Sequence, residues 1–386
     1  MSDLSMADES SPKRPQVTAH NQSRVRSYLR CRRQFYYRYD YPVLKMGARP
    51  GLELQPKRPA LPLKRGSWMH KLMEAYWLEL AQRPATYTIV RGKKTTEVEV
   101  EGWEGMHEVL TQEFDRLFDE EKEAYGDLPG DCERLFRGYL RRWKDDADKF
   151  RLASLHSGEP AVEFTIEVPL TEWGIEAPFK GTIDILVEDL EYGGLWIRDA
   201  KWVRNIPGPD ERMMSPQNII YVWAMRQLDY DVRGFIYDYG RTKAPTPPMI
   251  LQSGMVTTRK NLDTDTYTYL QAIKQAHDDE WKLYLPYYKN KLKEVKARDV
   301  TWFDRERIPV EGPRFRNGVA EYIAAARGIE RRGQAIRTYI RSCRWDCAYH
   351  EPCVAQFQGM DIRGLMKTQY ELEPERYGLD EETSQG

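Results

Sequence analysis

Two aspartates and a lysine on a predicted pair of strands could hold a divalent metal ion. Residues 182–188 and 195–202 are rich in β-branched and aliphatic side chains, and the segment between them contains acidic residues and adjacent glycines that suit a turn. If this six-residue turn sets the register, Asp184 faces Asp199 on the neighbouring strand at about 5 Å. Carboxylates so close repel each other unless a cation lies between them, and a divalent metal accepts such oxygen ligands.

The residue two places after the second aspartate adds a positive charge to the same site. Lys201 and Asp199 project from the same face of the strand, about 7 Å apart. The register that pairs the two strands in this way places Glu188 opposite Leu195 next to the turn. The sequence therefore predicts a metal site with a cationic neighbour. The alternative is a surface hairpin with ordinary charges, because Asp-x-Lys sequences are common.

A histidine on a predicted helix could supply a further metal ligand. Residues 65–81 carry large apolar side chains at helical spacing, and His70 lies among them. A single histidine in an apolar helix is more often a packed core residue, so both roles stay open from the residues alone. Residues 161–170 alternate between apolar and polar side chains, which predicts a half-buried strand with Glu163 on its polar face.

A helix after the Asp-x-Lys strand would bring two more polar side chains together. Ser215 and Pro216 are a typical start for a helix over residues 215–228. Gln217 and Tyr221 are four residues apart and so share a face of this helix. Packing of Tyr221 in the core is the alternative to a role in the site.

The overall composition indicates a folded protein whose contacts with nucleic acid must be local. The chain has 386 residues, of which 41% are hydrophobic and 31% charged, and its net charge is −1. This length allows two or three domains, or one domain with insertions. A net charge near zero gives no long-range attraction to nucleic acid. No apolar run has the length of a membrane span, and the N-terminus lacks an apolar signal segment, which predicts a cytoplasmic protein.

The predicted organisation is one folded region between two disordered ends. Residues 1–22 are rich in serine, proline and acidic residues, and residues 373–386 are acidic, so disorder is predicted for both. Residues 23–372 form the predicted folded region. Within it we expect a helical insertion at about 101–155 and a second helical region at about 258–341.

Two basic segments are candidates for contact with nucleic acid. Six arginines and no acidic residue lie between Asn21 and Tyr39, interleaved with aromatic side chains. Arginine pairs with phosphate and aromatic rings stack on bases, although a solvated helix face is an equal alternative. Residues 289–298 hold five basic residues and one acidic residue, and here the pattern favours a solvated face. The arginine candidates for DNA contact are Arg24, Arg26, Arg30 and Arg33.

Asp184 in the sequence GTID, followed by Asp199, Ala200 and Lys201, resembles the D…(D/E)-x-K core of the PD-(D/E)XK nucleases. More narrowly, it resembles the RecB-like branch of that family. This branch includes AddB and the CRISPR-associated exonucleases.

Further elements of the RecB-like branch follow in the expected order. The spacing of Gly66 and His70 is similar to its G-x-x-x-H element, in which the histidine helps to hold the metal. Gln217 and Tyr221 are similar to its Q-x-x-x-Y element, which points toward the active site and the bound strand. Residues 23–41 resemble the opening motif of this branch, S-x-L-x-x-C-P-R-x-F-Y-Y-R, except that Arg32 occupies the position where this motif usually has proline.

The resemblance implies an α/β fold of the restriction-endonuclease type, with a central mixed sheet flanked by helices. It implies a metal-dependent DNA nuclease, an exonuclease more than an endonuclease, that uses Mg²⁺ or Mn²⁺. A bound metal polarises the phosphate and activates water, and Lys201 would orient that water or offset charge on the phosphate. Glu163 would be at most a supporting group outside the direct ligands. The implied catalytic residues are Asp184, Asp199, Lys201, Gln217 and Tyr221. The implied metal ligands are His70, Asp184, Asp199 and the carbonyl of Ala200.

The cysteines form a second candidate site. Five cysteines in a reducing cytosol favour metal or redox chemistry over disulfides. Three of them, spaced x3 then x5 near the C-terminus, together with one in the arginine-rich segment, resemble the [4Fe–4S] clasp of AddB. The spacing departs from the usual x2 then x5. Zinc, with His350 as a substitute ligand, and unrelated free thiols are the alternatives. The implied cluster ligands are Cys31, Cys343, Cys347 and Cys353.

The resemblance also implies partners and a setting. DNA, single-stranded or with free ends, is the expected substrate. The chain has no Walker-type G-x-x-x-x-G-K-[ST] motif, so a helicase or recombination partner would be a separate chain. The implied setting is a bacterial or phage-infected cell, in which DNA repair or recombination, CRISPR adaptation and phage DNA metabolism all stay open. Two other functions stay open: a DNA-end-binding subunit without catalysis, and a zinc-stabilised structural protein.

Overall fold

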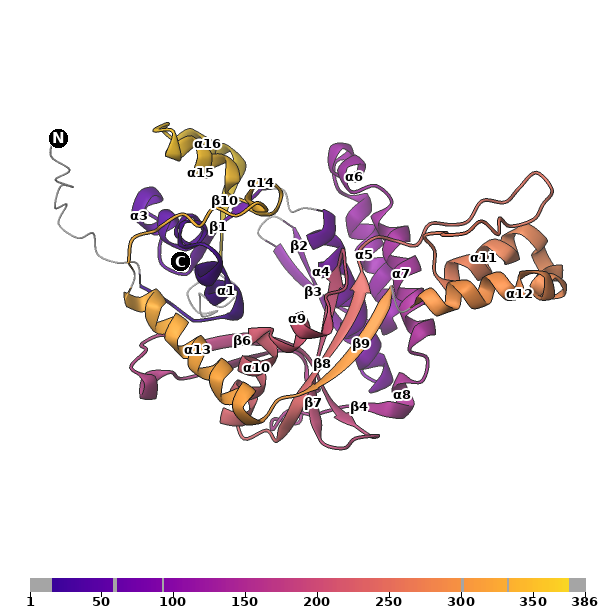
Figure 1. Cartoon of the computed structure of the whole chain (residues 1–386), viewed down its shortest axis with the longest axis horizontal. Helices are drawn as coiled ribbons and strands as arrows, with labels where there is room; N and C mark the ends of the chain where they lie inside the picture. The colour runs from indigo at the N-terminus through magenta and orange to yellow at the C-terminus, as the bar shows by residue number, and fades with distance from the viewer. Residues whose placement is uncertain (1–15, 58–60, 92–93, 300–301, 332, 375–386) are drawn as a thin grey trace.

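The computed structural model describes residues 16–374, except 58–60, 92–93, 300–301 and 332. Within these residues the core is a six-stranded sheet with helices on both sides (Figure 1). The strand order is β4-β6-β7-β8-β9, with β5 also paired to β6, and β7 runs parallel to β8 while the other pairs are antiparallel. This mixed α/β architecture confirms the predicted fold class. The strands are β4 (Phe150–Leu152), β5 (Val162–Val168), β6 (Phe179–Asp189), β7 (Leu195–Val203), β8 (Val232–Arg241) and β9 (Phe303–Pro309).

The hairpin of β6 and β7 has the predicted register. Glu188 pairs with Leu195 next to the turn. Gly193 and Gly194 have φ angles of 71° and 78°, a left-handed conformation that glycine adopts without steric cost. The two glycines therefore let the chain reverse direction within a short turn, and the turn fixes which side chains of the two strands face each other.

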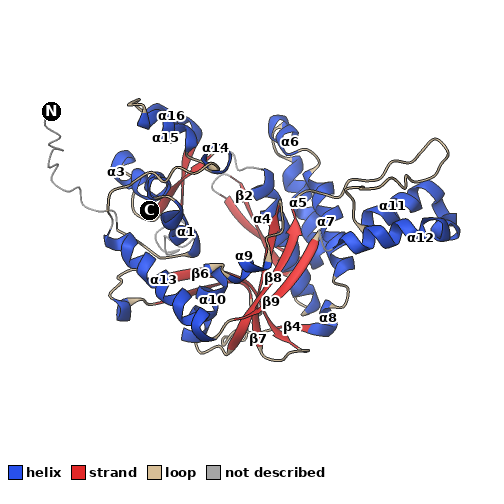
Figure 2. Cartoon of the chain, viewed as in Figure 1, coloured by secondary structure: helices blue, strands red, loops and turns tan. Residues whose placement is uncertain are grey.

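Helices cover both faces of the sheet (Figure 2). On one face, α1, α10 and α13 share an apolar core with Phe179, Ile197 and Phe235 of the strands. On the other face, α4, α5 and α7 share a second core with Ile185 and Trp196. The strands that carry Asp184 and Asp199 are therefore fixed from both sides. These helices are α1 (Gln22–Arg30), α4 (Leu61–Leu80), α5 (Gly102–Asp115), α7 (Leu128–Arg142), α10 (Pro216–Gln227) and α13 (Gly312–Arg331).

The segment before the first sheet strand is helical, and strand β4 lies within the last residues of the predicted insertion. The Asp127 side chain accepts a hydrogen bond from the N–H of Gly130 and so caps α7, whose first turn contains Pro129. Buried residues at helical spacing, such as Leu135 and Tyr139, then turn one side of α7 toward the core. The insertion also contains α6 (Asp119–Tyr125) and α8 (Asp146–Lys149).

A buried network of charges joins the insertion to the back of the sheet. Arg198 of β7 is 1% exposed, and its guanidinium contacts Asp146 Oδ2 at 2.7 Å and Asp238 Oδ2 at 2.5 Å. Arg305 of β9 pairs with the same two carboxylates, and the Tyr139 hydroxyl donates to Asp238. Two cations and two anions therefore offset one another, which such deeply buried charges require.

The two ends of the described chain pack together at one side of the molecule (Figure 1). β1 (Leu52–Pro56) pairs antiparallel with β10 (Tyr370–Pro374), and Tyr37, Leu54 and Tyr349 share a small core beside them. The first and last parts of the chain thus form one lobe. Its helices are α2 (Arg32–Phe35), the π-helix η1 (Tyr36–Asp40), α3 (Tyr41–Met46), α14 (Cys343–Asp346), α15 (His350–Phe357) and α16 (Arg363–Gln369).

A helical hairpin projects from the sheet between β8 and β9 (Figure 1). It consists of α11 (Thr266–His277), the 3-10 turn η3 (Asp278–Glu280) and α12 (Trp281–Arg298), and we call it the arm. The arm has an apolar core of its own, which includes Tyr269 and Tyr288. The remaining elements are β2 (Ala85–Arg91), β3 (Lys94–Val100), η2 (Thr171–Trp173) and α9 (Pro209–Met213).

The ordered chain begins earlier than predicted. His20 is fully buried and forms an isolated bridge with Phe179, and Asn21 caps α1. The disorder predicted for residues 1–22 is therefore wrong from residue 16 onward, and residues 1–15 lie outside the described chain.

The second helical region is also less helical than predicted. It contains strand β9 at the sheet edge, and residues 333–341 form no helix. Of the predicted acidic tail, residues 375–386 lie outside the described chain, while the two residues before them belong to β10. No helix in the described part of the chain combines the length and apolar character needed to cross a membrane.

Candidate active site

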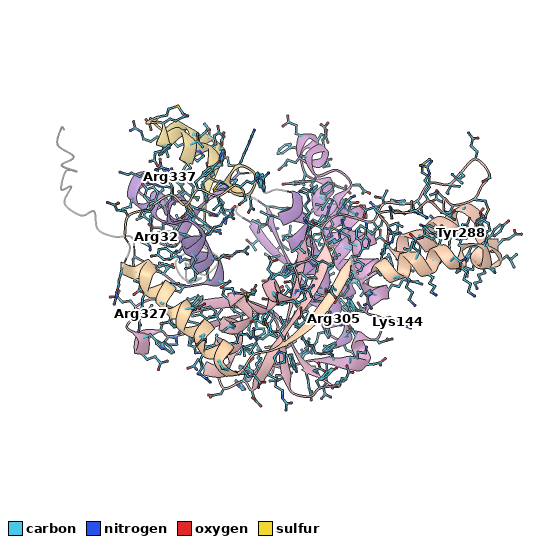
Figure 3. All side chains as sticks on the ribbon, viewed as in Figure 1. Arg32, Lys144, Tyr288, Arg305, Arg327 and Arg337 are labelled. Atoms are coloured by element: carbon cyan, nitrogen blue, oxygen red, sulfur yellow. The ribbon has the colours of Figure 1, made fainter. Side chains whose placement is uncertain are left out.

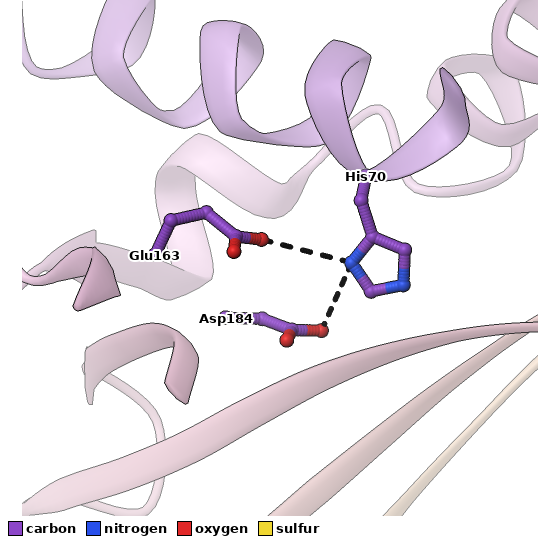
Figure 4. Close-up of side chains that lie close together, drawn as sticks. All are labelled: His70, Glu163 and Asp184. Atoms are coloured by element: carbon purple, nitrogen blue, oxygen red, sulfur yellow. Dashed lines mark ion pairs between the residues drawn. The ribbon is translucent and has the colours of Figure 1, made fainter. Parts of the chain in front are cut away.

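Three side chains from three elements converge on one point beside the sheet (Figure 4). His70 comes from α4, Glu163 from β5 and Asp184 from β6. His70 Nδ1 lies 3.3 Å from Asp184 Oδ2 and 3.7 Å from Glu163 Oε1. One ligand atom of each residue lies within 4.8 Å of the other two, and the side chains are only partly buried. One imidazole nitrogen and two carboxylates are a donor set that suits Mn²⁺ and, less well, Mg²⁺.

Glu163 reaches this point through an unusual backbone conformation. Its φ angle is 45°, in the left-handed region that a residue with a β-carbon avoids. The ladder between β5 and β6 pairs Val162 with Ile185 and Phe164 with Ile183, and Glu163 lies between these pairs. Such strain costs roughly 1–3 kcal/mol and persists where the surroundings require it, as at functional sites. The structure thus places Glu163 among the direct ligand candidates, whereas the sequence suggested only a supporting position.

Asp199 lies next to the cluster and is held by its neighbours. Lys201 Nζ lies 2.7 Å from Asp199 Oδ2, and the Gln217 side-chain amide donates to Asp199 Oδ1 at 2.9 Å. The N–H of Ala200 donates to Asp184 Oδ2 at 3.0 Å, so the two aspartates are tied to the same short stretch of β7. The backbone pairing of β6 with β7 ends at Ile185 and Arg198, which are the direct chain neighbours of Asp184 and Asp199.

The site concentrates charges that change one another's pKa. Burial is the main cause that raises the pKa of Asp199 to about 6; the ammonium of Lys201 opposes this rise and Asp184 adds to it. Burial lowers the pKa of His70, but Asp184 and Glu163 outweigh it, so the pKa of the imidazole is raised. The carboxylates likewise overcome burial at Lys201 and raise its pKa. The raised pKa favours the ammonium form of Lys201, which can offset negative charge.

The two predicted residues of α10 have different surroundings. Gln217 contacts Asp199 directly, as expected for a residue that points toward the site. Tyr221 is 6% exposed and packs edge-on against Phe179, with 6.0 Å between ring centroids. The structure thus brings Gln217 to the predicted metal site and places the ring of Tyr221 in the adjoining core.

A sequence model of the PD-(D/E)XK nuclease superfamily matches residues 19–354, which is most of the chain. The chain belongs to the PD-(D/E)XK nuclease superfamily. This membership makes it a metal-dependent nuclease, which is a phosphodiester hydrolase, and nucleases of this superfamily typically use Mg²⁺ or Mn²⁺. No curated protein matches the chain in sequence.

The arginines proposed to contact DNA are mostly engaged within the nuclease. Arg24 is 2% exposed and its guanidinium lies over Tyr39, so a surface contact with DNA is wrong for this residue. Arg30 forms an ion pair with Asp346 at 2.8 Å. Arg33 donates to the side chain of Gln356. Arg26 is exposed.

The four candidate cluster cysteines line one cavity. Cys31, from the N-terminal segment, and Cys343, Cys347 and Cys353, from the C-terminal segment, all border a space of about 410 Å³. Within the described chain, no three of these sulfurs come within 4.8 Å of one another. A zinc ion would draw them to about 3.8 Å, given Zn–S bonds of about 2.3 Å. The fifth cysteine, Cys132, is fully buried in the helical insertion.

Proposed function

We propose that this nuclease cuts DNA at a metal site formed by His70, Glu163, Asp184 and Asp199, beside Lys201. The observation that carries the proposal is the convergence of His70, Glu163 and Asp184 within 4.8 Å, next to the ion pair of buried Asp199 with half-buried Lys201. A non-catalytic DNA-binding subunit has no need of this arrangement.

Each side chain of the site has a distinct task in the proposed reaction. A bound Mg²⁺ or Mn²⁺ supplies a Lewis acid and lowers the pKa of water in its coordination shell. His70, Glu163 and Asp184 would hold the ion, with Asp184 oriented by the N–H of Ala200. Asp199 would complete the carboxylate set, and the carbonyl of Ala200 is a further ligand candidate.

Lys201 would act on the reacting phosphate, and Gln217 would orient Asp199. The ammonium form of Lys201, which the neighbouring carboxylates favour, would offset the negative charge that develops on the phosphate or orient the attacking water. Gln217 is a positioning residue, because it fixes the carboxylate of Asp199 by a hydrogen bond. Tyr221 supports the wall of the site from the core.

We further propose that the four cysteines hold a [4Fe–4S] cluster, as in the RecB-like branch that the sequence resembles. The N–H groups of Thr338 and Ile340 lie 3.4 Å from the sulfurs of Cys31 and Cys343, and N–H donors to sulfur are typical of such clusters. The cavity that the four cysteines share and the aromatic rings that line it support room for a cluster between the two segments. The cluster would clasp the N- and C-terminal segments.

The proposed substrate is DNA that is single-stranded or has free ends, and a helicase or recombination partner would be a separate chain. Exonuclease action, a cytoplasmic setting in a bacterial or phage-infected cell, and a role in repair or recombination are parts of this proposal. These parts of the proposal rest on the resemblance to the RecB-like branch, whose D…D-x-K, G-x-x-x-H and Q-x-x-x-Y elements occur in this chain.

Digestion of end-labelled DNA tests the proposal. Linear and circular DNA, single- and double-stranded, are incubated with Mn²⁺ or Mg²⁺, and with EDTA as control. We expect linear DNA to be degraded from its ends and circular DNA to survive. Lys201→Ala should lower the rate at least about 100-fold, because the charge on the phosphate then lacks its cation. Cutting by the Lys201→Ala variant at the parent rate would refute the assignment.

A further inference from the structure

Four exposed lysines form a row along one side of α12. They follow each other at intervals of seven, four and three residues, so they lie on the same face of the helix. At about 1.5 Å per residue the row is roughly 21 Å long. We call Lys282, Lys289, Lys293 and Lys296 the lysine row.

The lysine row differs from an ordinary solvated helix face. On such a face, acidic and basic residues alternate and pair at intervals of three or four residues. Helix α12 has six basic residues and one acidic residue, whereas the whole chain has nearly equal numbers of the two. That acid, Glu294, already pairs with Lys291 and Arg298. In the described chain no carboxylate forms an ion pair with a member of the row, although Asp278 and Asp279 of η3 precede Lys282 by four and three residues. From Lys289 to Lys296, Glu294 is the one acidic residue, so this part of the row keeps a net positive charge.

The arm presents this row on packed helices, although Pro286 interrupts the hydrogen bonding of α12 between Lys282 and Lys289. Tyr269, Ile273, Tyr288 and Val295 are fully buried between its helices and the preceding loop. The Tyr288 hydroxyl accepts a hydrogen bond from the N–H of Val256, which ties the loop to α12. Figure 3 labels Tyr288 within the part of the molecule that projects beyond the sheet. The lysines are therefore held in fixed order on a protruding surface, which a disordered basic tail would not provide.

The root of the arm lies next to the catalytic strand. In the parallel pairing of β7 with β8, Lys201 is opposite Tyr239, and β8 ends two residues later at Arg241. The chain returns from the arm at Phe303, which pairs with Gly240. The arm is thus inserted at the end of the sheet where both β8 and the Asp-x-Lys strand β7 terminate.

We propose that the arm binds the phosphate backbone of duplex DNA through the lysine row and holds the substrate beside the nuclease site. The choice of DNA as the occupant rests on the proposed function. Lysine supplies point charges without base recognition, and from Lys289 to Lys296 the helix carries no aromatic side chain on which an unpaired base could stack. These features favour duplex backbone over single-stranded DNA or a folded protein.

The test measures binding without cutting. Fluorescence anisotropy of a labelled blunt duplex is recorded in EDTA at 50–200 mM salt, a range over which backbone contacts change affinity strongly. The variant is Lys282→Gln, Lys289→Gln, Lys293→Gln and Lys296→Gln combined. Its matched control combines Lys45→Gln, Lys94→Gln, Lys149→Gln and Lys367→Gln. The control lysines are also exposed, lie outside the arm and change the net charge equally.

We expect the row variant to lose affinity and salt dependence together. Each lost phosphate contact lowers the slope of log affinity against log salt by about 0.9, so four contacts lower it by about 3.6. The parent protein's affinity should then fall roughly 100-fold more than the variant's between 50 and 200 mM salt. The control variant should keep the parent slope.

Three results would overturn this inference: a parent-like slope for the row variant, an equal loss in the control, or an equal loss on single-stranded DNA. Circular dichroism of both variants verifies that they are folded. Failure of the proposed nuclease activity would be seen separately, as intact duplex when Mn²⁺ replaces EDTA with the parent protein.

Discussion

The N–H of Ala200 donates a hydrogen bond to Asp184 Oδ2 at 3.0 Å, which ties the first aspartate of the site to the strand that carries the second. A backbone donor cannot be lost by a change of side chain, so the relative position of the two strands is set by the sheet itself. Asp199, in contrast, depends on the side chains of Lys201 and Gln217. The two aspartates should therefore respond differently to mutation of their surroundings.

Gln217→Leu should reduce cutting by about 10- to 100-fold, the usual effect of losing a group that orients a metal ligand. Asp199 would lose the donor that fixes its carboxylate. Gln227→Leu, an exposed position at the end of the same helix, is the matched control and should cut at the parent rate. A titration with Mn²⁺ should show that Gln217→Leu needs more metal for half-maximal cutting. Unchanged metal dependence and rate would mean that Gln217 does not position Asp199.

The left-handed φ of Glu163 predicts that glycine at this position gives a more stable protein than alanine, which is the reverse of the usual order in a strand. Both Glu163→Ala and Glu163→Gly remove the carboxylate and should lose Mn²⁺ binding. The glycine variant should nevertheless be more stable than the alanine variant by about 1 kcal/mol, because glycine relieves the strain. At Thr165, an exposed position on the same strand, alanine should be the more stable by about 0.5–1 kcal/mol. Urea unfolding measures all four variants, and the same order at both positions would contradict a strained Glu163.

Asp146→Asn should destabilise the fold by about 3–5 kcal/mol, because Arg198 and Arg305 would keep their buried charges without this partner. Glu188→Gln breaks an exposed pair with Arg151 and should cost less than about 1 kcal/mol. The free energy of unfolding in urea measures both. Equal, small losses would show that the buried network does not fasten the insertion to the sheet.

Cys347→Ser should abolish binding of the proposed cluster. The parent protein, purified without oxygen, should contain about four iron atoms and four acid-labile sulfides per chain. Cys132→Ala is the control, because this buried thiol lies in the insertion and should not affect iron content. Zinc in place of iron, or iron that survives Cys347→Ser, would rule out the assignment.

The register of the site could be read from the sequence because alternating strands and a glycine turn fix it locally. The role of Glu163 could not, since it depends on one backbone angle that the alternation of β5 does not reveal. Strand β9 was missed for another reason. Its sequence FDRERIP is highly charged, and only the fold shows that Arg305 pairs with the buried Asp146.

The roles of the arginines in residues 21–39 also could not be read from local sequence. Arginines among aromatic residues suggested a surface for DNA, but Arg24 is packed over Tyr39 and Arg30 pairs with Asp346 across more than 300 residues. Long-range partners decide whether a charge is free, and local sequence does not contain them. The pairing of β1 with β10 likewise joins two short segments from opposite ends of the chain.

The most direct measurement is anomalous X-ray scattering from crystals soaked in Mn²⁺. The account predicts a peak at coordination distance from His70, Glu163 and Asp184, and its loss in crystals of Asp184→Asn. The same Mn²⁺ should restore DNA cutting after EDTA treatment of the parent protein only. An empty position between these three side chains, in crystals of protein that cuts DNA with Mn²⁺, would contradict the account.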